Sequence, residues 1–306
     1  MGSIRFYKIA IIMAIFRLQY CQSQSAINNL LSPSDTLNTS RKNAVIISES
    51  AIASATLIGL SQMWYADFER SRFKTINDSN EWLQLDKYGH SFSAYQLSRL
   101  GANVMNWSGA DSKTQILNGS ILSLGFLTTV EVFDGFSKEW GFSWSDMAAN
   151  AAGTGLFVGQ ELIWQEQRIL LKYSFHQTRF AAQRPGKLGD GLLEEMLKDY
   201  NGQTYWLSAN LHSFLKNENI PKWINLAFGY GAEGMLTGNN DTLGGQFPDQ
   251  NRYRQFYISL DVDFSRIKTN SRILKTLFDV FNVIKVPFPT LSLDRENGTK
   301  LHLIYF

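Results

Sequence analysis

Ten residues in the last third of the chain alternate between apolar and polar side chains. They read Phe256-Tyr257-Ile258-Ser259-Leu260-Asp261-Val262-Asp263-Phe264-Ser265. A period of two places successive side chains on opposite faces of a β-strand. The face that carries Phe256, Ile258 and Leu260 is wholly apolar, and the opposite face is mostly polar. This stretch therefore predicts a strand with one apolar face, and it sets the fold class of the region around it.

The alternation recurs through the rest of the region from 171 to 306. Further segments with this pattern or with short apolar runs are 205–214, 223–230, 291–293 and 301–306. The pair Asn297-Gly298 predicts a hairpin between the last two. The stretch 271–284 has its apolar residues on one side of a helix and predicts an amphipathic helix. The region 171–306 is therefore expected to be an antiparallel sheet with one inserted helix.

The apolar face of this sheet has two interpretations. It packs on helices in a soluble fold, or it faces lipid in a barrel-like outer-membrane protein. Five to seven strands can be counted, fewer than the usual eight of such a barrel. Packing on helices is therefore the preferred interpretation, although alternation alone does not distinguish a lipid face from a core face.

The preceding region, 44–170, has apolar residues at helical spacing. The expected helices are 44–64, 86–107, 113–134 and 145–171. Short connections make the last three antiparallel neighbours. In the last helix, Gly155 and Gly159 predict a ridge of small residues at a close helix contact. The expected fold class is α+β, an N-terminal antiparallel helical bundle followed by the antiparallel β-rich region, with barrel-like closure left open.

Residues 1–25 have the order of features of a secretory signal peptide. Basic residues precede an apolar run at 9–16, which is too short to span a bilayer, and small polar residues follow. Cleavage after Ser25 and lipid attachment at Cys21 are the two alternatives. Residues 26–43 are predicted to be a polar linker. The protein is therefore expected to be exported to the periplasm or the outer membrane.

Composition narrows the classes of partner. The 306 residues include 29 Lys and Arg against 27 Asp and Glu, a formal net charge of +2, which argues against nucleic acid as a partner. Hydrophobic residues make up 44% and charged residues 18% of the chain, which favours contact with the membrane or other envelope components. A single cysteine excludes a disulfide framework and paired-cysteine metal motifs. No protein partner is indicated.

Each of the last three predicted helices carries polar residues on its apolar stripe. These residues are Asp86, Lys87, His90, Glu131, Asp134, Asp146 and Asn150. Because the helices are antiparallel neighbours, the beginning of one, the end of the next and the beginning of the third lie at the same end of the bundle. The sequence therefore predicts one polar cluster there.

Three roles for this cluster stay open. The preferred one is a structural network of hydrogen bonds and ion pairs. The second is a site for a divalent metal, with Asp86, His90, Glu131 and Asp134 as ligands, and the third is acid–base catalysis. Carboxylates at a helix C-terminus, such as Glu131 and Asp134, oppose the helix dipole and need a partner. A divalent metal is the only cofactor that these residues suggest.

The spacing of these residues resembles a known family. Asp86-Lys87-x-x-His90, Glu131-x-x-Asp134-Gly135 and Asp146-x-x-x-Asn150-x-x-Gly153 resemble the YfiM-like family of predicted bacterial envelope lipoproteins of unknown function. More distantly, their order is similar to that in VanZ-like membrane proteins. The stretches 77–82 and 198–206 resemble the longer Bacteroidetes-type members. Val130 stands where the family commonly has Lys. The resemblance implies an envelope location and no established activity.

Two functions follow as hypotheses. The first is a structural or binding protein of the cell envelope, whose polar cluster holds the bundle together. The second is a metal-dependent hydrolase or transferase that acts on a lipid or cell-wall phosphate, in which Asp146 or His90 transfers protons. The sequence does not decide whether the protein is an enzyme.

Overall fold

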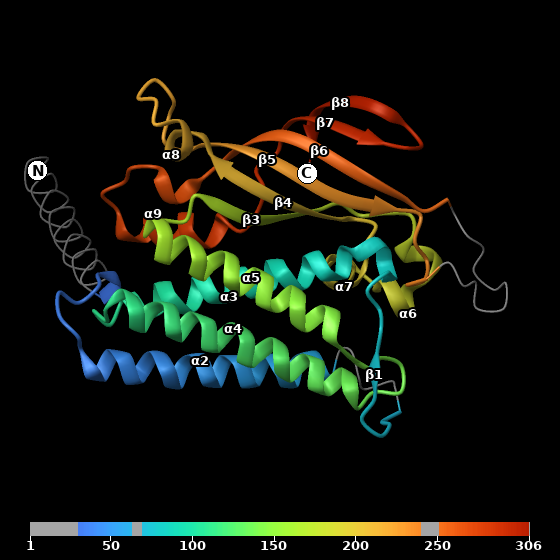
Figure 1. Ribbon diagram of the computed structural model, residues 1–306, viewed down its shortest axis with the longest axis horizontal. Coiled ribbons are helices and arrows are strands. Elements are labelled where there is room, and N and C mark those ends of the chain that lie inside the picture. Colours follow the sequence, from blue (N-terminus) through green and yellow to red (C-terminus); the bar gives the residue numbers. More distant parts are fainter. Residues whose placement is uncertain (1–29, 63–68, 240–250, 306) are drawn as a thin grey trace, which may run out of the picture.

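The computed structural model describes residues 30–62, 69–239 and 251–305. The predicted signal peptide, including Cys21, lies outside these residues. Figure 1 shows four long helices below a twisted sheet. The long helices are α2 (Thr39–Leu60), α3 (Leu85–Asn106), α4 (Ser112–Gly135) and α5 (Trp144–Trp164). The short ones are α6 (Pro185–Leu188), α7 (Leu192–Lys198), α8 (Leu211–Leu215), α9 (Arg272–Phe281) and the 3-10 turns η2 (Glu81–Gln84), η3 (Ala181–Gln183) and η4 (Phe264–Arg266).

Six strands form an antiparallel sheet in the order β3-β4-β5-β6-β7-β8. They are β3 (Ile169–Phe175), β4 (Gln203–Asn210), β5 (Ile224–Glu233), β6 (Tyr253–Val262), β7 (Phe288–Asp294) and β8 (Gly298–Tyr305). A separate parallel pair, β1 (Thr75–Ile76) with β2 (Phe142–Ser143), joins the segments that precede α3 and α5. The α+β class is confirmed. The described strands form no closed barrel, because β3 and β8 are the edges of the sheet.

The helix predicted at 145–171 is too long. It ends at Trp164, Gln165 takes a left-handed conformation with φ of 53°, and Ile169 begins β3. Gln160 stabilises this corner, because its side-chain oxygen accepts hydrogen bonds from the backbone N–H groups of Arg168 and Ile169. The apolar residues at 169–171 continue the helical spacing by chance, which explains the error.

Close helix contact depends on glycine at two positions of the bundle. A Cβ atom on Gly119 of α4 would lie 2.0 Å from the backbone oxygen of Ser98, and one on Gly153 of α5 would lie 2.0 Å from that of Ser91. Both oxygens belong to α3, so these glycines let α4 and α5 reach its backbone. The ridge predicted at Gly155 and Gly159 is wrong, since nothing described lies within 4 Å of a Cβ at either position.

The sheet carries its polar side chains inside and its apolar side chains outside. Buried polar residues on the inner side include Lys172, Ser208, Asn225, Asp261 and Thr290. The exposed apolar residues on the other side, here called the outer apolar face, are Leu207, Phe228, Phe256, Ile258, Leu260, Leu291, Leu293, Leu301 and Leu303. The preferred interpretation, a sheet face packed on helices, holds only at one margin. There Phe92 of α3 contacts Tyr173 and Tyr205, and Tyr88 stacks on Tyr230.

Two helices in the described part of the chain are long and apolar enough to cross a membrane, judged by length and composition. They are α2 and α4, each with a mean hydropathy of 1.5 over its most apolar window. Only 6% of that window is buried in α2 and 22% in α4. Figure 1 shows both at the margin of the molecule opposite the sheet.

Candidate functional site

The site begins at a strained turn. Trp82, Leu83 and Gln84 have positive φ angles of 49°, 51° and 68°, a conformation that costs a non-glycine residue of order 1 kcal/mol or more. Contacts with the sheet region hold the turn, because the Tyr230 hydroxyl donates to the Leu83 carbonyl at 2.5 Å and the Trp82 N–H donates to Gly238. The turn places Asp86 and the next residues in the first turn of α3.

Lys87 connects three carboxylates. Its Nζ lies 2.8 Å from Asp78 Oδ2, 2.8 Å from Asp86 Oδ2 and 2.5 Å from Asp146 Oδ1. The Lys87 side chain is largely buried, and these carboxylates raise the pKa of its ammonium against the opposing effect of burial. Lys87 therefore stays charged and ties the segment before η2 to the beginnings of α3 and α5.

Asp78 belongs to this network, although no periodic pattern in the sequence predicted it. It accepts hydrogen bonds from the hydroxyls of Ser143 and Ser145, at 2.6 and 2.7 Å. Although burial opposes ionisation, its bond with Lys87 lowers the pKa of Asp78 to about 2. The Ser143 hydroxyl also accepts from the Asp146 N–H, as the N-cap of α5.

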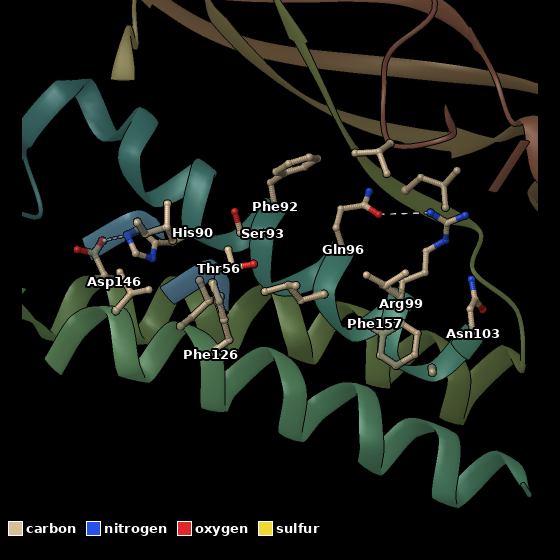
Figure 2. Close-up of a pocket in the computed structure, with 18 of the residues that line it drawn as sticks. Thr56, His90, Phe92, Ser93, Gln96, Arg99, Asn103, Phe126, Asp146 and Phe157 are labelled. Carbon is tan, nitrogen blue, oxygen red and sulfur yellow. Dashed lines mark hydrogen bonds and ion pairs between the residues drawn. The ribbon is translucent and has the colours of Figure 1, made fainter. Parts of the chain in front are cut away.

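His90 lies among carboxylates of all three helices. Its Nδ1 is 3.1 Å from Asn150 Oδ1. Its Nε2 lies 3.6 Å from Glu131 Oε1, 3.8 Å from Asp86 Oδ1 and 3.9 Å from Asp146 Oδ1, and Figure 2 shows His90 and Asp146 pointing toward one another. Asp86, His90 and Asp146 each offer one ligand atom within 4.8 Å of the others. We call Asp86, His90, Glu131 and Asp146 the His90 cluster.

Besides Asp146 Oδ1, which has the Lys87 ammonium at 2.5 Å, two buried polar atoms beside His90 have no hydrogen-bond partner among the described residues. They are Glu131 Oε1 and Asn150 Nδ2. The other oxygen of Glu131 accepts from the Ser143 N–H at 3.1 Å. A buried carboxylate oxygen without a partner is costly, since it has lost its hydration without replacement. The unpartnered oxygen of Glu131 lies 3.6 Å from His90 Nε2.

Burial and like charges hold protons on this cluster. Burial, helped by the carboxylates of Asp146 and Asp134, raises the pKa of Glu131 to about 8. Burial and the charge of Asp86 raise the pKa of Asp146 to about 7. Although burial opposes its charged form, the three carboxylates of the cluster raise the pKa of His90. The charges of His90 and Lys87, with a hydrogen bond from Tyr200, outweigh burial and lower the pKa of Asp86.

The charges do not balance without protons or a cation. Four carboxylates meet here, Asp78 and the three of the His90 cluster, with the single ammonium of Lys87 and the imidazole of His90. Fully ionised, they would leave an excess of negative charge in a largely buried space, which is unfavourable. Either protons on Glu131 and Asp146 or a bound cation removes that excess.

Six of the seven predicted site residues lie in these contacts. The exception is Asp134, one turn beyond Glu131 on α4, whose carboxylate is not among those within 4 Å of His90 and which lines the cavity described below. The sequence predicts Asp134 as a metal ligand beside His90, but the structure has Asp146 in that position. Sequence reasoning missed Asp78 and Tyr200, although both fall in the two longer stretches of family resemblance.

The His90 cluster opens into a large cavity. The cavity has a volume of about 1770 Å³, and Asp86, His90 and Asp146 are among its lining residues. Figure 2 shows His90 and Asp146 toward one end of its wall and Arg99 with Phe157 toward the other. Its wall combines apolar side chains such as Phe126 with charged ones, so it offers room for a ligand that has both kinds of surface.

Comparison with known proteins finds one family match, over the segment that contains this site. Residues 75–159 match the model of a family described as predicted periplasmic lipoprotein (DUF2279). The matched segment runs from β1 into α5 and contains the whole His90 cluster with Lys87 and Asp78. No curated protein and no solved structure matches the chain. The family description supports an exported protein of the cell envelope, while the YfiM-like and VanZ-like names stay predictions.

Proposed function

We propose that the chain is a binding protein of the cell envelope whose His90 cluster takes up a divalent cation. The observation that carries the proposal is the spacing of three carboxylate oxygens around His90 Nε2, at 3.6 to 3.9 Å. Ligand atoms about 2.1 Å from a tetrahedral cation lie roughly 3.4 Å from one another. A charged histidine that donated directly to a carboxylate would lie at about 2.8 Å. The spacing fits ligands that share a cation better than direct hydrogen bonds.

The tautomer of His90 supports the same role. Asn150 Oδ1 accepts from Nδ1, which leaves the lone pair of Nε2 directed at the carboxylates. A hydrogen bond on the second ring nitrogen is the usual way in which a protein orients a histidine ligand. One imidazole with carboxylates suits Zn²⁺ or Mn²⁺. Lys87 then has a structural part, since it neutralises Asp78 and contacts Asp86 through Oδ2, the oxygen farther from His90. Asp146 Oδ1 is shared, since it contacts the Lys87 ammonium and also faces His90 Nε2.

Calorimetric titration of the chelator-treated full chain with Zn²⁺ and with Mn²⁺ tests this proposal. We expect one ion to bind per chain, and Glu131→Gln to weaken binding at least tenfold because it removes an anionic ligand. Asp134→Asn is the matched control, since it makes the same change one turn along α4, and its affinity should stay within about threefold of wild type. Absence of saturable binding in wild type, or equal losses in both variants, would count against the site.

A second candidate is a hydrolase or transferase that acts on a lipid or cell-wall phosphate. The favouring observation is a pair of carboxyl groups, Glu131 with a pKa of about 8 and Asp146 with a pKa of about 7, beside a cavity with apolar walls. Such groups exchange protons near neutral pH, and a cation beside them would polarise a phosphate. Release of p-nitrophenol from bis(p-nitrophenyl) phosphate, lost in Asp146→Asn, would support this candidate. Metal binding without turnover would support the binding role and count against the enzyme.

A further inference from the structure

The polarity of the sheet is the reverse of that in a soluble sandwich. The inner side holds Lys172 and Asp261 as a fully buried ion pair at 2.9 Å, and Ser208 donates to the same carboxylate at 2.7 Å. These polar partners need each other inside, so the sheet cannot turn its apolar side chains inward. The outer apolar face is therefore a fixed property of the fold.

This outer apolar face is continuous across the strands. Register places Phe228 beside Ile258, Ile258 beside Leu291, and Leu291 beside Leu301. Each of these side chains is more than 40% exposed. A contiguous patch of this kind over β5, β6, β7 and β8 is characteristic of a surface that contacts a partner or a membrane.

One end of the sheet is rich in exposed cations. Near α8 and α9 the exposed basic residues are Lys216, Lys222, Lys268, Arg272 and Lys275. In the described parts of 211–224 and 264–280, which hold these cations, Glu218 is the exposed carboxylate, while Asp279 is partly buried and lies 3.8 Å from Arg99. Exposed Phe214 and Trp223 accompany these cations. Figure 1 shows α8 and α9 at the same end of the molecule.

We propose that the outer apolar face lies against an anionic lipid membrane. Its aliphatic and aromatic side chains enter the boundary between headgroups and acyl chains, and the basic residues near α8 and α9 contact lipid phosphates. Aromatic residues such as Trp223 favour that interfacial level. Because β8 leaves an unpaired backbone edge, which hydrocarbon does not tolerate, the sheet contacts the bilayer from one side and does not span it. This inference does not depend on the cation site.

A single fluorescent label on the face tests the proposal. Cys21 is the only cysteine, so a full chain with Cys21→Ser and Ile258→Cys takes one environment-sensitive label at the centre of the face. The control carries Cys21→Ser and Lys138→Cys, since the Lys138 side chain is also largely exposed but lies in the connection between α4 and α5, not on the sheet or beside α8. Vesicles of phosphatidylglycerol and phosphatidylcholine are added, with bromolipids as contact quenchers.

We expect emission from the label at 258 to shift to the blue and to be quenched by bromolipid, with no change at 138. Equal responses at both positions, or none at 258, would overturn the proposal. A label at 258 that is already blue-shifted without vesicles, in a chain that runs as a dimer, would assign the face to a second copy. An anchor in residues 1–29 does not mask the result, because the label reports its own surroundings.

Charge variants test the lipid headgroup part. Lys216→Gln with Lys222→Gln should weaken partition onto anionic vesicles about fivefold for each lysine removed, and should leave partition onto pure phosphatidylcholine unchanged. Lys138→Gln is the control, since Lys138 is an exposed lysine in the connection between α4 and α5. Equal effects of the double variant on both lipids would contradict the proposed contact with phosphates.

Discussion

Lys172 of β3 and Asp261 of β6 form an ion pair of 2.9 Å although two strands lie between theirs in the sheet. Both side chains are fully buried. The pair forms because the sheet curls, so that the inner sides of distant strands approach. A backbone contact between Tyr173 and Ile284 at the edge of β3 accompanies the same curl. The ion pair explains why the sheet keeps a polar inside and an apolar outside.

Removal of one partner of this pair should be strongly destabilising. Lys172→Met leaves Asp261 charged and buried, and we expect a loss of about 3–5 kcal/mol in the free energy of unfolding. Lys138→Met is the control, because its ion pair with Glu69 is more than two thirds exposed and should contribute less than about 1 kcal/mol. Urea unfolding followed by circular dichroism measures both.

The double variant Lys172→Met with Asp261→Leu should recover much of that loss, since no lone charge then stays inside. If Lys172→Met alone costs less than about 1 kcal/mol, water or Lys285 replaces the missing charge and the inside of the sheet is less rigid than the structure indicates.

The second prediction concerns the glycine of the third motif. In Gly153→Ala the new methyl group would lie 2.0 Å from the backbone oxygen of Ser91, so α3 and α5 must separate. We expect a cost of about 1–3 kcal/mol in the free energy of unfolding. Gly155→Ala is the control on the same helix, where the space is open and alanine should stabilise by up to about 1 kcal/mol. Similar effects of both changes in thermal melts would contradict the close contact.

The helical part of the site was predictable because two regularities act together. A period of 3.6 residues places Asp86 and His90 on one face, and short connections bring the ends of three helices together. Asp78 and Tyr200 lie outside the helices and join the site through tertiary contacts, so no periodic pattern reports them. Asp134 shows the limit of prediction from an apolar stripe. It lies one helical turn beyond Glu131, yet it lines the cavity and is not among the carboxylates within 4 Å of His90.

The sheet illustrates a different limit. Alternation in 256–265 correctly predicted β6, with its end three residues too far along the chain. Alternation could not predict which face of the sheet is inside. That choice depends on the ion pair between Asp261 and Lys172, which are 89 positions apart in the chain. The interpretation that the apolar face packs on helices failed for this reason over most of the sheet.

The third prediction concerns pH. In the metal-free chain Glu131 and Asp146 have folded-state pKa values raised to about 8 and about 7, from ordinary values of 4.5 and 3.8. Such groups take up protons on folding, so stability is highest below pH 4 to 5 as far as they contribute, and falls as the pH rises to about 8. The raised pKa of His90 acts in the same direction.

We therefore expect the melting temperature of the chelator-treated chain to be higher at pH 5 than at pH 8, with a smaller difference in Glu131→Gln. Thermal melts at both pH values measure this difference. An equal difference in wild type and Glu131→Gln would show that Glu131 is not the group responsible.

The last prediction separates a structural network from a cation site. A bound ion present at about one hundred times its dissociation constant stabilises the folded chain by about 2.7 kcal/mol, or about 4 °C in melting temperature for a chain of this size. We expect wild type loaded with Zn²⁺ to lose that increment in chelator. Glu131→Gln should melt at the same temperature with and without chelator, since it lacks an anionic ligand, while Asp134→Asn should respond like wild type.

In a purely structural network, chelator has no effect on wild type, and Glu131→Gln is neutral or stabilising because it removes like-charge repulsion and keeps the shape of the side chain. That second pattern would assign the His90 cluster to holding α3, α4 and α5 together.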